Sequence, residues 1–475
     1  MTERRRTFVL AATIFAVALA VYGSMLPAGV GIGDEAEAQT VPYILGIAHP
    51  TGFPAYTLAG WVFSHALPFG TVAWRLNAFV AVCTALGTAG VFLLAEAVAG
   101  GAAAAALAAA TFAFGATVWN GALHANAQVL AGTCSVYALL ACVLFARSGN
   151  PRTLLAACAL CGLGIATHPS AIWIVPAVVV ASFWQRRAVT RGSLGFALIA
   201  FTIPFVLYAY LPVRSAIVAA RGLDPAAATP IFARGSIDWD TNAPRTPAGF
   251  LDEVLARKQG AGHALLRTAD LRALPEAALL WFNMASAQYP IWLLLLAAAG
   301  TLTLARHDLR PLSILAVGAL GGVLFLRVYR MDAHLDRYVF VSFAVVAVLA
   351  AASVRLPRMR LIAILALAVL AGLELAQDRP RLPLGPRADG DSLIAAVRGA
   401  TPDRAIVIAS WDDATVLGYG AFVERALGSR IIITAWFGMP AGAYERWEAA
   451  RPLLLRLSPV EAHQVWYMPP GAPAP

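Results

Sequence analysis

Long apolar runs separated by short polar connections fill most of the chain. A hydrocarbon layer of roughly 30 Å requires about 20 apolar residues in one helix, and about eleven runs approach that length. They cover residues 8–26, 78–98, 102–118, 129–146, 154–167, 171–184, 194–211, 278–304, 312–326, 339–354 and 361–376. The pattern therefore predicts an α-helical polytopic membrane protein whose fifth and sixth spans are short enough to be tilted or offset.

Arginines gather in alternate connections between these runs. The basic segments contain Arg4 to Arg6, Arg147 and Arg152, Arg186, Arg187 and Arg191, Arg306 and Arg310, and Arg355, Arg358 and Arg360. All of them fall on one side if the spans alternate, and short arginine-rich loops stay in the cytoplasm. We therefore expect a cytoplasmic N-terminus. The loop 27–77, the connection 214–275 and the tail after Ala376 should face outward.

The composition supports a membrane protein. Hydrophobic residues make up 60% of the 475 residues, charged residues make up 13%, and the mean hydropathy is +0.71. A soluble protein of this length could not bury so much apolar surface. The net charge of +9 comes mostly from arginines in loops, so it gives no reason to expect nucleic acid as a partner. All five cysteines lie in apolar runs, and the Cys158-x-x-Cys161 pair is assigned to helix packing.

The composition changes after Ala376, where a Pro- and Arg-rich linker begins. Residues 405–409, 430–434 and 463–468 have the pattern of strands, and residues 415–427 and 443–457 have helical spacing. This order predicts a small α/β domain with parallel pairing. We therefore divide the chain into a transmembrane domain, 1–376, and a C-terminal extracytoplasmic domain, 377–475. Asp412 and Asp413 follow the first strand, where they could bind a ligand or cap the next helix, and capping is favoured.

The long outer connection has two parts. Residues 224–247 are rich in Pro, Gly and Asp or Asn, which predicts an irregular loop. Residues 250–274 place apolar residues at helical spacing with basic residues between them, which predicts an amphipathic helix at the membrane surface. Residues 55–67, with Trp61 and Phe63, fit the same description.

The segment from Gly33 to Pro54 carries the densest set of reactive groups. Asp34, Glu35 and Glu37 lie beside a hydrocarbon boundary, where charged groups are costly unless they are hydrated or paired. The run from His49 to Pro54, HPTGFP, predicts a stiff, non-helical turn. Two interpretations remain open. The segment is a reaction site, or it is a D-x-x-E capping box at a helix start with His49 bonded to a loop carbonyl.

Several motifs taken together resemble one membrane-protein family. They are Asp34-x-x-Glu37, residues 45–56 (LGIAHPTGFPAY), Ala73-Trp74-Arg75-Leu76-Asn77, Thr167-His168, Tyr210-Leu211-Pro212-Val213-Arg214, Asp336-Arg337-Tyr338 and Ser410-Trp411-Asp412-Asp413-Ala414-Thr415. They resemble a bacterial multi-spanning family of uncharacterised function, related to the eukaryotic transmembrane protein O-mannosyltransferase and to the GT-C glycosyltransferases. The resemblance implies a GT-C-like fold, with about 11 transmembrane helices, in a bacterial inner membrane. Members usually carry Glu-Val-Tyr near the start of the fourth span. Here residues 124–130 read HANAQVL, so no role for that acid carries over.

The resemblance also implies a reaction. GT-C enzymes transfer a sugar from a polyprenyl phosphate to an acceptor on the outer face. A carboxylate can take the proton of the attacking hydroxyl, and the departing phosphate needs fixed positive charge. We assign Asp34 as the base and Glu37 as the residue that orients the acceptor or a metal. Residues assigned to substrate binding are Arg337 first, then His49, Arg75, His168, Arg214, Arg327, Arg330 and Tyr338.

Alternatives remain for several of these assignments. Any single arginine could instead extend to the membrane interface without a ligand. The resemblance requires no metal; if one binds, Asp34, Glu37 and His49 are the expected ligands. The predicted function is transfer of a mannose-like sugar from a lipid-linked donor to an acceptor hydroxyl, on protein Ser or Thr or on a glycan. A transporter or flippase of lipid-linked sugars, or a scaffold, is the alternative. Spans without central charged residues or matched broken helices favour the enzyme.

Overall fold

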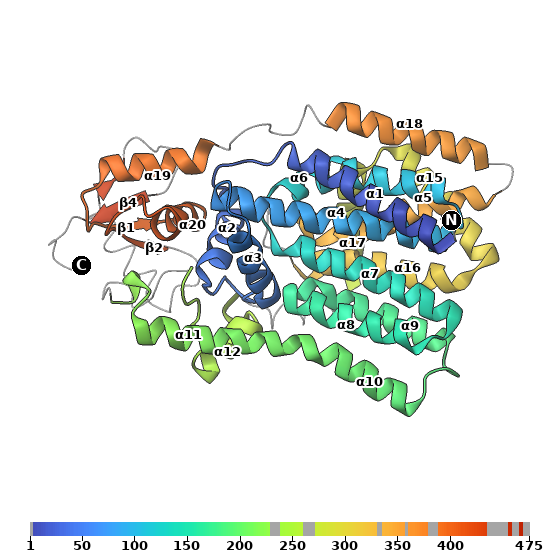
Figure 1. Ribbon diagram of the computed structural model, residues 1–475, viewed down its shortest axis with the longest axis horizontal. Coiled ribbons are helices and arrows are strands. Elements are labelled where there is room, and N and C mark those ends of the chain that lie inside the picture. Colours follow the sequence, from blue (N-terminus) through green and yellow to red (C-terminus); the bar gives the residue numbers. More distant parts are fainter. Residues whose placement is uncertain are drawn as a thin grey trace.

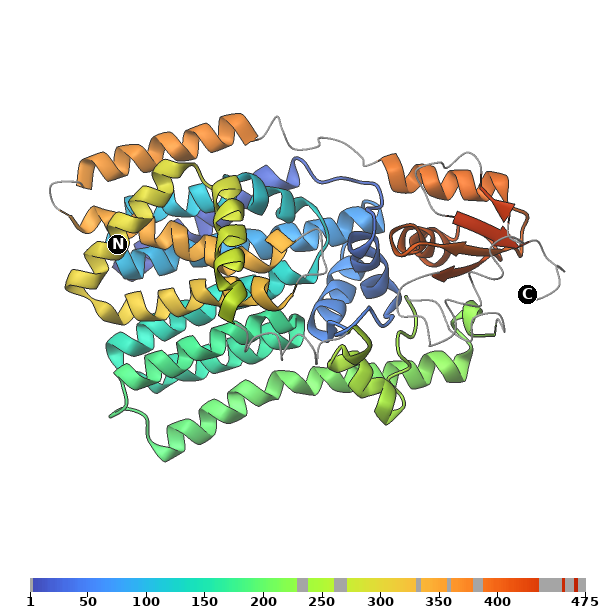
Figure 2. The same ribbon diagram turned by 180° about the vertical axis from the view of Figure 1, so that it is seen from behind.

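A bundle of helices and a small sheet domain make up the structure. The computed structural model describes residues 3–228, 238–259, 271–329, 335–356, 360–378, 388–434, 455–457 and 465–468. The bundle extends along the long axis, and the sheet lies at the end opposite the N-terminus (Figures 1 and 2). The expected helical membrane architecture with a small C-terminal α/β part is therefore confirmed.

The first half of the chain contains the acidic segment and most of the bundle. Its helices are α1 (Glu3–Gly23), α2 (Asp34–Ile44), α3 (Pro54–Ala66), α4 (Val72–Ala99), α5 (Ala102–Phe114), α6 (Ala116–Leu123), α7 (Ala127–Ser148), α8 (Pro151–Thr167), η1 (Pro169–Ile174), α9 (Val175–Trp184), α10 (Arg191–Thr202), η2 (Ile203–Ala209) and α11 (Tyr210–Arg221). The second half continues with η3 (Pro225–Ala228), α12 (Pro247–Val254), η4 (Arg257–Gln259), η5 (Leu271–Ala273), α14 (Leu274–Gln288), α15 (Ile291–His307), α16 (Leu309–Val328), η6 (Leu335–Val339), α17 (Phe340–Ala352), η7 (Ser353–Arg355), α18 (Arg360–Asp378), α19 (Ala388–Ala400), α20 (Trp411–Gly418) and the π-helical turn η9 (Tyr419–Val423).

The helices are those of a multi-pass membrane protein. Among the described residues, six helices are long and apolar enough to cross a membrane, or up to eight if each of two bent pairs forms one span. Two further apolar helices, Pro151–Thr167 and Pro169–Trp184, are shorter. The total of about eleven spans remains a prediction.

Two expected straight spans are broken. The run 102–118 divides into α5 and α6, which meet at an angle of 63°, and the run 278–304 divides into α14 and α15 at 115°. The sequence pattern predicted each run as a single span, so both breaks were missed. The two breaks are joined by one buried side chain. The Nε2 of Gln288 donates to the carbonyl of Phe112 (3.2 Å), and its Oε1 accepts from the backbone N–H of Val118 (3.0 Å). Backbone groups released by the break at Gly115 are thus satisfied within the bundle.

The arginine-rich connections meet at one end of the bundle. Arg147, in the last turn of α7, forms an ion pair with Asp308, between α15 and α16, at 3.6 Å. Gln185, after α9, donates to the carbonyl of Ala146 at 2.8 Å. The acidic helix α2 and the sheet lie at the other end (Figure 1). The two ends are therefore separated as the alternating spans predict, while the side of the membrane that each one faces remains a prediction.

The C-terminal sheet has four described strands in the order β2-β1-β4-β3. β1 (Ile406–Ala409) pairs in parallel with β2 (Ile431–Thr434), as expected. β4 (Val465–Met468) is antiparallel to β1 and to β3 (Leu455–Arg456), so the prediction of wholly parallel pairing was wrong. β3 also replaces the end of the helix expected over 443–457, whose residues 443–454 lie outside the described residues. The sequence reading missed α19.

The C-terminal domain shares a hydrophobic core with the acidic loop. Buried Val30, Ala36 and Ala73 belong to the same apolar cluster as Leu393 of α19 and Leu417 of α20. The backbone N–H of Ala73 also donates to the Tyr419 hydroxyl at 3.0 Å. These contacts seat the domain directly against the loop that carries the acids.

The outer connection is less helical than expected. α12 ends at Val254, and Ala256 has a left-handed backbone (φ 47°), so the helix predicted over 250–274 does not continue. Residues 260–270 of that segment lie outside the described residues. The helix expected over 55–67 is present as α3, and its place at a membrane surface remains a prediction.

Candidate active site

The first turn of α2 positions the acids. Gly33 precedes the helix with φ 62°, a conformation that glycine adopts without strain. Asp34 is the first helical residue, and no side chain caps this helix start. Neither Asp34 nor Glu37 therefore forms the capping box that the spacing allowed. Carboxylates in a first helical turn are stabilised by the helix dipole, and both remain available for contacts outside the helix.

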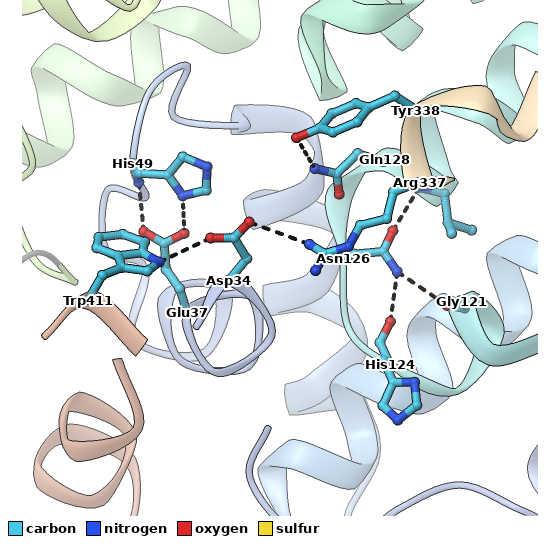
Figure 3. A network of polar contacts seen from close by, with 11 residues as sticks. Asp34, Glu37, His49, Gly121, His124, Asn126, Gln128, Arg337, Tyr338 and Trp411 are labelled. Atoms are coloured by element: carbon cyan, nitrogen blue, oxygen red, sulfur yellow. Dashed lines mark hydrogen bonds and ion pairs between the residues drawn. The ribbon is translucent and has the colours of Figure 1, made fainter. Parts of the chain in front are cut away.

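Asp34 joins three distant parts of the chain. Its Oδ1 accepts from the indole Nε1 of Trp411, at the start of α20, at 3.1 Å. Its Oδ2 lies 3.4 Å from Nη1 of Arg337, in η6. Figure 3 shows the carboxylate between these two donors. Roughly a quarter of the Asp34 side chain (27%) is exposed, so the carboxylate can be reached from outside.

Glu37 and His49 form an ion pair beside Asp34. The Glu37 Oε1 accepts from the backbone N–H of His49 at 2.7 Å, and its Oε2 contacts the ring Nδ1 (Figure 3). Burial alone would lower the pKa of His49. The Glu37 charge and hydrogen bond, with smaller effects of Asp34 and Glu253, outweigh burial and raise the pKa to about 9. At neutral pH this histidine is therefore a cation held by Glu37.

The expected stiff turn follows His49. The N–H of Gly52 donates to the carbonyl of His49 at 2.8 Å, and Pro54 begins α3. The imidazole packs edge-on against Phe53 (4.9 Å between ring centroids) and Trp411 (5.5 Å). The turn thus presents the His49 cation between two aromatic rings.

His168 and Tyr338 lie beside the same turn. The His168 ring stacks on Phe53 and contacts Tyr338, both with centroids 5.3 Å apart. The Tyr338 hydroxyl accepts from the Nε2 of Gln128 at 3.5 Å (Figure 3). Burial and the nearby His49 cation lower the pKa of His168 to about 3, so this ring is neutral. The structure therefore brings both residues to the edge of the acidic site.

A pocket opens between the acids and the start of α7. It is lined by Asp34, Glu37, Ala38, Val41, Pro42, Ala48, His49, Phe53, Tyr56, Thr57, Asn126, Ala127, Gln128 and Arg337. Gln128 and Arg337 also line a second, adjacent pocket between α7, η1, α16 and α17. The sequence reading missed Asn126, Gln128 and Trp411. Each lies in a segment that the resemblance had marked, residues 124–130 and 410–415.

Only one of the five proposed arginines is seen in the acidic site. Arg75 donates to the carbonyls of Ser64 (3.1 Å) and Phe69 (3.0 Å). Arg214 donates to the carbonyls of Ile44 (3.0 Å) and Leu45, where it closes the end of α2. Arg327 is buried in the last turn of α16, and Arg330 lies outside the described residues. Phosphate binding by these four remains a prediction.

A buried acid lies behind the His49 turn. Glu253 of α12 accepts from Nδ2 of Asn242 at 2.9 Å, and its pKa is raised well above the usual range by burial. The carbonyl of the neighbouring Asp238 accepts from the N–H of Ile47 at 3.2 Å. The outer connection therefore supports the acidic segment from behind, which its irregular composition had not indicated.

The residues named for a metal do not form a metal site. Among the described residues, no three His, Cys, Asp or Glu side chains are grouped to hold an ion. Glu37 and His49 pair with each other, and Asp34 is directed toward Trp411 and Arg337. No step proposed below uses a metal.

Part of this chain is similar to a known protein family. Residues 34–191 match the family described as the protein O-mannosyl-transferase TMEM260 N-terminal domain. The mouse protein O-mannosyl-transferase TMEM260 is 31% identical over 219 residues, 44% of this chain and 31% of the mouse protein. The Dictyostelium discoideum protein is 32% identical over 76 residues, 16% of this chain and 9% of that one. The matched region thus spans about a third or less of these relatives.

The solved structures that are similar share the fold at low identity. ArnT from Cupriavidus metallidurans has a TM-score of 0.52 in its apo state, with 13% identity and 98% of each chain covered. The structure of that protein bound to undecaprenyl phosphate has a TM-score of 0.51 with 14% identity, covering 98% of this chain and 99% of that one. The Archaeoglobus fulgidus oligosaccharyltransferase has a TM-score of 0.50 with 12% identity, covering 89% and 64%. The resemblance to the O-mannosyltransferase family and to the GT-C fold is confirmed.

Proposed function

We propose that this chain is a membrane glycosyltransferase that transfers a sugar from a polyprenyl-phosphate donor to an acceptor hydroxyl. The observation that carries the proposal is the placement of Asp34 opposite Arg337 in one pocket. The region similar to the O-mannosyltransferases begins at Asp34 and contains both acids and the His49 turn. The fold also resembles that of ArnT, whose structure holds undecaprenyl phosphate.

The reaction needs one base and one site of positive charge. Asp34 accepts the proton of the acceptor hydroxyl while its oxygen attacks the anomeric carbon of the sugar. The bond between that carbon and the phosphate oxygen breaks, and the phosphate leaves with the electron pair. No acid is required for this step, because a phosphate is already a stable anion. Atoms and charge therefore balance with a single carboxylate, unlike glycoside hydrolysis with its two carboxyl groups.

Arg337 supplies the positive charge. A guanidinium carries five N–H donors in a planar fork that suits phosphate oxygens. Asp34 contacts the Nη1 end of that fork at 3.4 Å. The donor phosphate competes with Asp34 for this guanidinium, and its binding releases the Asp34 Oδ2 beside the phosphate. The pair of Glu37 and His49 fixes the turn beside them, and the His49 cation adds to the positive potential at the phosphate.

Mannose is the sugar we propose to test first, and a protein Ser or Thr hydroxyl is the acceptor. Both proposals are supported by the O-mannosyltransferase relatives, which match the acidic part of the chain. We place the reaction on the outer face of the membrane, opposite the arginine-rich loops. The alternative, flipping of lipid-linked sugars, predicts movement of the lipid without a new glycosidic bond.

The test is sugar transfer by the purified full chain in lipid nanodiscs. Radiolabelled polyprenyl-phosphate mannose is supplied with a Ser- and Thr-containing peptide, and labelled peptide is measured. We expect transfer by the wild type and a large loss of transfer in Asp34→Asn. Asp252→Asn is a matched control, because that carboxylate pairs with Arg257 (2.9 Å) and Lys258 (3.0 Å) on the outer connection. Translocation of the donor without transfer to any hydroxyl acceptor would establish the flippase instead.

A further inference from the structure

The tail of the chain contributes a donor to the acidic site. Trp411 and Asp34 are 377 residues apart in sequence, yet the indole Nε1–H donates to the Asp34 Oδ1 at 3.1 Å. Trp411 begins α20, directly after β1, so it belongs to the C-terminal domain. The membrane bundle supplies the other contact of the carboxylate, Arg337 on Oδ2. Each oxygen of Asp34 is therefore held by a different part of the protein.

The approach of the two backbones fixes this contact. The N–H of Gly33 donates to the carbonyl of Asp412 at 3.4 Å. A Cβ atom on Gly33 would lie 2.5 Å from the Asp412 Oδ1, so a larger residue would have to displace the Asp412 side chain. Together with the shared core of Val30, Ala36 and Leu417, this close approach leaves Trp411 little freedom. The indole is delivered to Asp34 by packing, not by a flexible arm.

We propose that Trp411 is a positioning residue for Asp34, and that through this indole the C-terminal domain completes the active site. The inference rests on the proposed function, in which Asp34 is the base. It assigns the tail a role in the chemistry of the membrane domain, besides any role in display or folding.

The contacts with Trp411 and Arg337 give the two oxygens of the Asp34 carboxylate different roles. When the donor phosphate takes the Arg337 guanidinium, the Oδ2 of Asp34 loses its contact with Nη1 and becomes the oxygen that accepts the hydroxyl proton. The Oδ1 stays bonded to Trp411, which prevents the carboxylate from rotating toward the phosphate. A neutral N–H orients the base without neutralising its charge, and a cation in the same place would weaken the base more.

Trp411→Phe tests this role, because it keeps an aromatic ring and removes the N–H. We expect kcat for sugar transfer to fall about tenfold to a hundredfold with little change in KM for the donor. A carboxylate that loses a donor to its charged form holds its proton to higher pH. The acidic limb of the pH–rate profile should therefore move upward by about one pH unit. Unchanged kcat and an unchanged limb would overturn the proposal.

Trp239→Phe is the matched control. Trp239 packs edge-on against Phe422 of the C-terminal domain (5.7 Å between centroids), and within the described residues its Nε1 has no hydrogen-bond partner. This variant loses an indole N–H without losing a bond, so its rate and pH profile should match the wild type. An equal effect of both substitutions would reduce Trp411 to general packing.

A second measurement needs no substrate. Thermal unfolding of the wild type, Asp34→Ala, Trp411→Phe and the double variant gives a cycle that isolates the contact. We expect the Tm loss of the double variant to be smaller than the sum of the two single losses. If Trp411→Phe fails to fold, benzothienylalanine at position 411 keeps the two-ring shape and removes only the N–H.

The activity measurement and the unfolding cycle together distinguish the proposed function from the positioning role of Trp411. Coupled Tm values with no sugar transfer by the wild type would overturn the proposed function and leave the contact standing. Additive Tm values with transfer intact in Trp411→Phe would overturn the positioning role alone.

Discussion

Asp34 and Arg337 lie 3.4 Å apart although 303 residues separate them in the chain. The acid begins a short helix, α2, and the arginine sits in a 3-10 turn that leads into α17. A carboxylate and a guanidinium at this distance attract each other, but part of that attraction is lost when a phosphate competes for the cation. The pair is therefore both a structural contact of the free protein and a site that a phosphate donor can open.

Arg337→Lys should weaken donor binding by about 1–3 kcal/mol, because lysine keeps the charge and loses the planar fork. Binding of a fluorescent polyprenyl phosphate to purified protein measures the effect. Arg147→Lys is the control, since Arg147 pairs with Asp308 at the opposite end of the bundle. Donor affinity that is unchanged even in Arg337→Ala would remove Arg337 from the site.

Asp34→Asn should reduce the rate of sugar transfer by a factor of about 10² to 10⁴ in a protein that still folds. Asparagine keeps an acceptor oxygen for Trp411 but has no charge with which to remove a proton. Asp34→Ala would be less informative, because it removes both properties. A folded Asp34→Asn enzyme with near-normal transfer would shift the role of base to Glu35 or Glu37.

The Glu37–His49 pair should make stability depend on pH above neutrality. The pKa of His49 is raised from about 6.5 to about 9 in the folded protein, so the stabilisation is fully present below pH 6.5 and is lost as the pH rises through 9. At about 1.4 kcal/mol per unit, the pair contributes roughly 3 kcal/mol at neutral pH. Measurements of Tm between pH 6 and 10 should show this decline in the wild type.

Glu37→Gln should flatten that decline, because it removes the charge that raises the histidine pKa. His65→Gln serves as the control, since His65 stacks on Tyr43 away from the acids (4.7 Å between centroids). A slope that persists in Glu37→Gln would mean that another group carries the pH dependence.

Gln288→Ala should lower the Tm clearly. Two buried backbone groups would lose their hydrogen bonds to this side chain, and each loss costs about 1–3 kcal/mol. The carbonyl of Phe112 and the N–H of Val118 have no water to replace the lost bonds inside the bundle. Gln185→Ala is the comparison, because its single bond to Ala146 lies at the half-buried end of the bundle. Equal Tm values for the two variants would show that the breaks are held in another way.

Labelling from outside intact cells should reach a cysteine at position 424, which is exposed on the C-terminal domain, and not one at position 187. Glu424→Cys and Arg187→Cys with a membrane-impermeant maleimide give the two readings. Position 187 should react only after lysis. If position 187 reacts in intact cells and position 424 reacts only after lysis, the topology is the reverse of the one predicted from the arginines.

The sequence alone was sufficient to predict local features, but it was insufficient to predict contacts between distant segments. The apolar runs predicted the helices, and the Pro- and Gly-rich HPTGFP segment predicted the turn after His49. Strand patterning located residues 463–468 but carries no information on direction, so their antiparallel pairing with β1 was missed. Likewise, Gly115 and Pro290 marked breaks that the length of their apolar runs concealed.

The arginines show the same limit at the site. Arg214 and Arg337 both belong to motifs of the resembling family, and both lie near span ends. The structure gives Arg214 the carbonyls that end α2 and gives Arg337 the carboxylate that begins it. Which of two similar side chains meets a reactive group depends on packing between segments far apart in sequence, and a single chain does not encode that pairing locally.

Val30 and Ala36 of the acidic loop share one hydrophobic core with Leu393 and Leu417 of the C-terminal domain. This shared core determines which segments must be exchanged together in a chimera with a related protein. A chimera that exchanges only the tail would bring foreign side chains against the acidic loop and misplace the indole. Exchanging residues 27–77 together with the tail keeps both faces of that junction from one parent. A chimera designed to change the substrate specificity of this protein should therefore exchange the loop and the tail together.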